Sequence, residues 1–68
     1  PANAIKFFNK AADADNEVLT PLYLKKAAVL YELEGEKDKA LKNYLKIRDE
    51  YPMSAEAQEV EKFIARLQ

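Results

Sequence analysis

A single glycine and three prolines punctuate a chain that is otherwise rich in strong helix formers. Ala, Leu, Lys and Glu dominate the segments between Pro21, Gly35 and Pro52, and these residue types favour helix. Proline is favoured in the first turn of a helix and glycine just after its end, so this punctuation divides the chain into helices. We therefore expect an all-α fold with about four helices.

Local signals place the ends of these helices. We expect helices over residues 2–14, 21–34, 37–50 and 55–67. Thr20 is expected to cap the second helix with its hydroxyl, because Pro21 follows at a first-turn position. Gly35 should end that helix in the left-handed conformation, Pro52 should close the third, and Ser54 should cap the fourth.

The second helix differs from the others because apolar and aromatic residues occupy most of its circumference. They are Leu22, Tyr23, Leu24, Ala27, Ala28, Val29, Leu30, Tyr31 and Leu33. Such a helix is buried on several sides or presents an apolar surface to a partner. We expect segment 21–34 to lie at the centre, with the other three helices packed on it.

Composition disfavours several functional classes. The 68 residues make one domain at most, and the chain contains neither Cys nor His, which removes thiolate metal sites and histidine chemistry. Eleven basic and twelve acidic residues give a net charge of -1, which disfavours nucleic-acid binding. No apolar run reaches the roughly 20 residues of a membrane span. We expect no enzymatic activity, no catalytic residue, no metal, no cofactor, no nucleic-acid partner and no membrane contact by this segment.

A short pattern occurs twice along the chain. A small and an apolar residue stand together, an aromatic residue follows three positions later, and an apolar residue follows three positions after that. The copies begin at Ala4 and Ala40, 36 positions apart, with Phe8 and Tyr44 as their aromatic residues. This spacing suggests a repeating unit of two helices.

A longer pattern spans residues 21–54, with large, small and aromatic positions on both sides of a glycine turn and a closing proline. Its residues are Leu24, Ala28, Tyr31, Gly35, Ala40, Tyr44, Ile47 and Pro52. In this register the segment resembles one complete tetratricopeptide repeat, a pair of antiparallel helices that stacks into an α-solenoid. Lys37, Ala27 and Ile47 depart from the usual residues of the family. The resemblance implies a close helix crossing at Ala28 and Ala40.

The resemblance also implies a domain organisation. Residues 1–20 would be the second helix of a truncated upstream repeat with its connection, 21–54 one complete repeat, and 55–68 a C-terminal capping helix. Glu61 falls where a following helix would need a small residue, which favours a cap. The chain is similar to the C-terminal part of tetratricopeptide proteins of Bacteroidota-type bacteria. That similarity implies the periplasmic side of the cell envelope with an anchor upstream, the alternative being the cytoplasm.

In this family the first helix of each pair lines a concave face that holds peptides. Carried onto this chain, that face comprises Leu22, Lys25, Val29, Glu32 and Leu33. The alternative is that the two charged residues are only solvated and the rest belong to the core. Some relatives hold a C-terminal carboxylate with a Lys and an Asn, but here Val29 replaces the Asn that would accompany Lys25.

Two functional classes remain open. The first is a scaffold that binds a peptide or protein partner through the concave face. The second is self-assembly, in which the exposed N-terminal helix pairs with another copy and this segment binds no peptide. The third helix has a lysine-rich side that includes Lys39, Lys42 and Lys46. This side is either simply solvated or binds an anionic surface.

Overall fold

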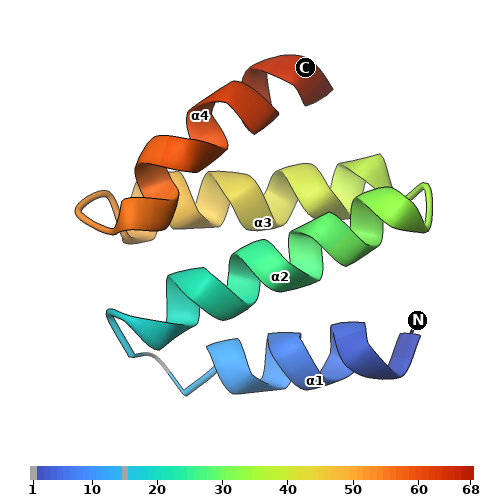
Figure 1. Cartoon of the computed structure of the whole chain (residues 1–68), viewed down its shortest axis with the longest axis horizontal. Helices are drawn as coiled ribbons and strands as arrows, with labels where there is room; N and C mark the ends of the chain where they lie inside the picture. Colours follow the sequence, from blue (N-terminus) through green and yellow to red (C-terminus); the bar gives the residue numbers. More distant parts are fainter. Residues whose placement is uncertain (1, 15) are drawn as a thin grey trace.

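Four helices that alternate in direction make up the computed structural model, which describes residues 2–14 and 16–68 (Figure 1). They are α1 (Ala2–Ala12), α2 (Leu19–Leu33), α3 (Lys37–Glu50) and α4 (Ala55–Leu67). The described residues contain no strand, so the all-α prediction is confirmed. The bounds of α3 and α4 agree with the predicted ones, while α1 and α2 each differ by one or two residues at their ends.

The cap of α2 is not the predicted one. Thr20 is buried, its Oγ1 accepts a hydrogen bond from the Asn16 N–H at 2.7 Å, and it donates to the Ala12 carbonyl at 3.1 Å. Asn16 acts as the cap instead, because its Oδ1 accepts from the N–H groups of Val18 and Leu19 at 2.8 and 2.9 Å. The Thr20 hydroxyl thus ties the end of α1 to the start of α2.

Gly35 makes the bend between α2 and α3. Its φ is +79°, the left-handed conformation predicted for it. The Gly35 N–H donates to the Glu32 carbonyl at 3.0 Å, and the Glu36 N–H donates to the Tyr31 carbonyl at 2.8 Å. These two bonds form a Schellman motif, which satisfies carbonyls that the end of α2 would otherwise leave free.

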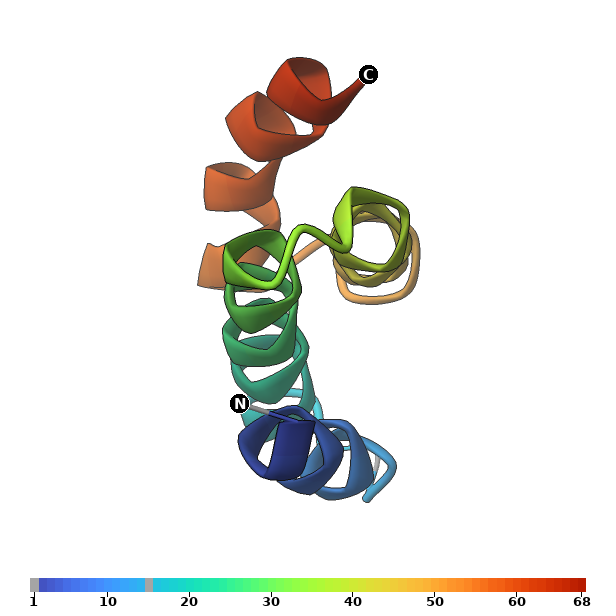
Figure 2. The ribbon, with the colours of Figure 1, turned by 90° about the vertical axis from the view of Figure 1, so that its right-hand side faces the viewer.

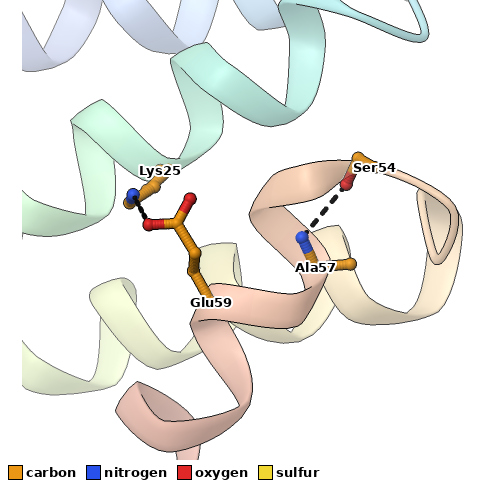
Figure 3. Close-up of polar contacts among 4 residues, drawn as sticks. All are labelled: Lys25, Ser54, Ala57 and Glu59. Atoms are coloured by element: carbon orange, nitrogen blue, oxygen red, sulfur yellow. Dashed lines mark hydrogen bonds and ion pairs between the residues drawn. The ribbon is translucent and has the colours of Figure 1, made fainter.

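Ser54 caps α4, as predicted. Its Oγ accepts from the Ala57 N–H at 3.1 Å (Figure 3), and its hydroxyl donates to the Tyr51 carbonyl at 2.7 Å. The same side chain therefore joins the end of α3 to the start of α4, and this fixes the turn between them.

The core lies where α2, α3 and α4 meet. Ala27, Ala28, Ala40, Tyr44, Ile47 and Val60 are fully buried. Ala28 and Ala40 belong to one apolar cluster, and small residues there let two helix backbones approach. Phe63 of α4 packs against Tyr44, with 5.4 Å between the two ring centroids.

The prediction that all other helices pack on α2 is only partly right. α1 and α3 pack extensively on α2, whereas α4 rests mainly on α3. The Cα positions extend 28 × 27 × 13 Å, so the molecule is a flat slab in which each helix packs chiefly on its chain neighbours. Figure 2 shows α1, α2 and α4 in one row, with α3 to one side of it.

The two copies of the short sequence pattern are not buried alike. Tyr44 is fully buried, but Phe8, its predicted counterpart, is only half-buried and stacks on Tyr23 at 6.0 Å between ring centroids. The residues that α1 buries are Ile5 and Ala12. The reason is that α1 packs on one side only, so its buried stripe is narrower than that of α3.

Candidate functional site

The outer side of α2 carries an apolar depression where it adjoins α1. This α1–α2 hollow has a volume of about 390 Å³ and is lined by Phe8, Leu22, Lys25, Lys26, Val29 and Leu30. Its walls are aliphatic and aromatic, while the two lysines supply its only charge. Val29 is 41 % exposed, a large fraction for an apolar side chain in the middle of a helix.

Of the five residues predicted for the concave face, the structure places three in the hollow and two outside it. Leu22, Lys25 and Val29 line the α1–α2 hollow together. Leu33 lies outside it, at the C-terminal end of α2, and is 79 % exposed. Glu32 also lies outside it and makes contacts with α3 and α4.

Lys25 is engaged within the chain. Its Nζ lies 2.7 Å from Glu59 Oε2 on α4, and the pair bridges α2 and α4 (Figure 3). The hydrogen bond from Lys25 lowers the pKa of the Glu59 carboxyl below its ordinary value. Within the described part of the chain Lys26 forms no ion pair, so it is the lysine of the hollow that is free to meet a partner's carboxylate.

Glu32 joins three helices. Its Oε2 accepts a hydrogen bond from the Tyr44 hydroxyl of α3 at 2.5 Å, and its Oε1 accepts from the Arg66 guanidinium of α4. Burial raises the pKa of the Tyr44 hydroxyl, and the hydrogen bond to Glu32 raises it further. Glu32 thus holds helices together, and its carboxylate is already satisfied by two donors.

A common sequence separation connects these inter-helix contacts. Lys25 pairs with Glu59, Glu32 with Arg66, and Asn43 with Asn9, and each pair is 34 positions apart. The first two pairs join α2 to α4, and the third joins α1 to α3. Helices two apart in the chain therefore lie in parallel with a constant offset.

Three residues of the hollow were not expected from the sequence. The sequence predicts Phe8 as the aromatic residue of the short repeated pattern and Leu30 as part of the apolar circumference of segment 21–34, and it predicts no role for Lys26. Lys26 lies four residues after Leu22 and three before Val29, and Leu30 lies four after Lys26, so this spacing does place them on one helix face. Only the packing of α1 against α2 brings Phe8 to the others.

Residues 2–14 and 16–68 contain no group of three or more acidic side chains arranged to hold a metal ion. None of the described helices is long and apolar enough to cross a membrane. Comparisons of this chain with protein-family models, with curated proteins and with solved structures find no match.

Proposed function

We propose that this chain is a protein-interaction module of the tetratricopeptide-repeat type that binds a partner peptide through the α1–α2 hollow. The observation that carries the proposal is the hollow itself, an apolar depression with one uncommitted lysine at its rim. Its volume of about 390 Å³ lies in the range of roughly 300–1,000 Å³ found for binding sites.

The 34-residue offset supports the repeat reading. Contacts between residues 34 apart are what stacked units of one constant length produce, because equivalent helices of neighbouring units then lie side by side. The antiparallel pair α2 and α3, with Gly35 at the bend, would be one such unit.

The lining of the hollow indicates what its occupant carries. Phe8, Leu22 and Val29 would surround one large apolar side chain, such as leucine or phenylalanine. Lys26 at the rim would meet a carboxylate close to that side chain in sequence. The partner segment is therefore apolar at one position and acidic beside it, and it needs no second apolar anchor.

The test is a selection of short displayed peptides on the immobilised chain, followed by amide chemical-shift mapping with each selected peptide. Peptides with a Leu or Phe beside Glu or Asp are expected, and their binding should shift the amide signals of Lys26 and Val29. Val29→Glu should weaken binding about tenfold or more, since it places a charge in an apolar contact. Leu33→Glu is the matched control, because it also replaces an apolar residue of α2 by glutamate but lies outside the hollow. Equal losses in both variants, or no selected peptide, would contradict the proposal.

One observation favours self-assembly as a second candidate function. Phe7 on α1 is 63 % exposed, and its ring lies edge-on to that of Phe8 with 5.5 Å between the ring centroids. A second copy could cover it. Sedimentation of the wild-type chain and of Phe7→Asp decides between the two functions. A wild-type dimer that dissociates to monomers in Phe7→Asp supports self-assembly. A wild-type chain that is monomeric at all concentrations contradicts self-assembly.

A further inference from the structure

A second depression lies on the opposite side of α2 from the α1–α2 hollow. It has a volume of about 350 Å³, and α1 and α3 form its walls while Leu24 and Tyr31 of α2 lie at its base. Figure 2 shows α2 set back between α1 and α3 on this side. We name it the basic groove, formed by Asn9, Tyr31, Lys39, Lys42, Asn43 and Lys46.

A chain of hydrogen bonds orders the polar groups at the base of the groove. Asn43 Nδ2 donates to Asn9 Oδ1 and to the Leu24 carbonyl, each at 3.3 Å. Asn9 Nδ2 in turn donates to the Tyr31 hydroxyl oxygen at 2.8 Å. The Tyr31 hydroxyl oxygen therefore accepts a hydrogen bond. No described residue accepts a hydrogen bond from the Tyr31 hydroxyl proton. That proton is free to be donated to an acceptor in the groove.

The wall contributed by α3 is positively charged along its length. Lys39, Lys42 and Lys46 follow one another at intervals of three and four residues, which places them on one face of the helix. Lys39 makes a loose ion pair with Glu36 at 3.6 Å, and no described carboxylate pairs with Lys42 or Lys46. Asp13, which directly follows α1, is the one acidic side chain in the lining, so the groove has an excess of positive charge.

We propose that the basic groove binds an extended acidic segment of a partner protein. Lys39 and Lys46 are seven residues apart, or about 10 Å along the helix axis. In an extended chain every second side chain points the same way, about 7 Å further on. Two carboxylates at alternate positions would thus fit along the row of lysines, and the Tyr31 hydroxyl would donate to one of them. A single phosphate ion would reach only part of this row.

The occupant differs from that of the α1–α2 hollow, and the two sites are independent. Leu24 and Tyr31, the α2 residues that line the groove, project from the side of α2 opposite to the residues of the hollow. The inference therefore stands whether or not the hollow binds a peptide. A nucleic-acid strand is disfavoured because Asp13 lies in the groove and the whole chain has a net charge of -1.

Fluorescence anisotropy with a labelled peptide that alternates Glu and Ser tests the proposal. The peptide should bind at low salt and weaken as salt is raised, while its Gln-Ser counterpart should not bind. Lys42→Glu/Lys46→Glu should weaken binding about tenfold or more, because it reverses the charge facing the carboxylates. Asp13→Asn should tighten binding, because it removes the repelling carboxylate.

The control is Lys37→Glu/Lys62→Glu, which makes the same change of charge outside the groove. Lys42 and Lys46 are exposed, and circular dichroism of each variant checks that its helices are intact. Equal weakening by both double variants would show attraction to the overall charge and overturn the proposal. Displacement of the peptide by inorganic phosphate at comparable concentration, tighter binding of a single-stranded oligothymidylate, or no binding of the Glu-Ser peptide at low salt would also overturn it.

Discussion

Tyr44 of α3 donates its hydroxyl hydrogen bond to Glu32 of α2 across a distance of 2.5 Å. The phenol ring is fully buried, whereas the Glu32 side chain is 22 % exposed and reaches Arg66 on α4 with its other oxygen. One buried aromatic residue thus anchors a carboxylate that joins three helices. This arrangement resists separation of α4, the helix that has the fewest other contacts with α2.

Tyr44→Phe should lower the free energy of unfolding by about 1.5 kcal/mol, the lower end for a hydrogen bond to a charged group, because Glu32 is partly exposed. Urea unfolding followed by circular dichroism measures it. Tyr23→Phe is the matched control, since no described residue forms a hydrogen bond with the Tyr23 hydroxyl. Equal losses in the two variants would show that the Glu32 bond contributes nothing.

The pair formed by Lys25 and Glu59 should be visible in an NMR titration. The pKa of Glu59 is lowered by Lys25, so it should rise towards the ordinary value of a glutamate in Lys25→Met. Because the folded-state pKa is depressed, the stability that the pair contributes is present above the unfolded-state pKa. It is lost as the pH falls through the folded-state value. An unchanged Glu59 pKa in Lys25→Met would mean that the bridge does not persist in solution.

Gly35→Ala should destabilise the fold by about 1 kcal/mol, because alanine is strained at the φ of +79° that the bend requires. The loss is backbone strain alone, since a Cβ at this position would meet no atom within 4 Å. Gly35→Asn should cost less, because asparagine tolerates the left-handed conformation better. Thermal unfolding of the two variants gives the order, and a larger loss for Asn would contradict this explanation.

Ala40→Trp should lower the free energy of unfolding by at least about 1–3 kcal/mol, because Ala40 is fully buried where α2 and α3 approach. That is a large share of the total stability expected for a small domain. Lys37→Trp adds the same side chain at an exposed position of α3 and should change the melting temperature little. An unchanged melting temperature for Ala40→Trp would show that the crossing is looser than described.

Most helix ends could be predicted because they depend on short-range interactions. The hydrogen bonds at Gly35 and Ser54 span three to five residues, so their neighbours in sequence are enough to identify them. The start of α2 could not be predicted in the same way, because Asn16 and Thr20 offer two side chains suited to one cap. In the structure the Thr20 hydroxyl donates to the Ala12 carbonyl, and Asn16 caps the helix.

The candidate site depends more on how the helices pack. Leu22 and Val29 were placed on a binding face from their positions on α2, and the structure brings them together. Lys25 and Glu32 were placed on the same face, but each has an oppositely charged partner 34 positions away on α4. Nothing in the local sequence identifies Glu59 as the partner of Lys25. Before the helices pack, Lys25 could form an ion pair of similar geometry with many of the acidic residues.

By itself, the sequence determined that the chain is helical, where the helices begin and end to within about two residues, and which residue makes the bend at position 35. Those features depend on backbone preferences and on contacts within a turn or two. Only the tertiary structure decided that α4 rests on α3, that Phe8 joins Val29 in one hollow, and that Asn9, Tyr31 and Lys46 share a groove. The reason is that surfaces assembled from different helices depend on the angle and offset at which the helices pack. That geometry is set by the fit of all their side chains together.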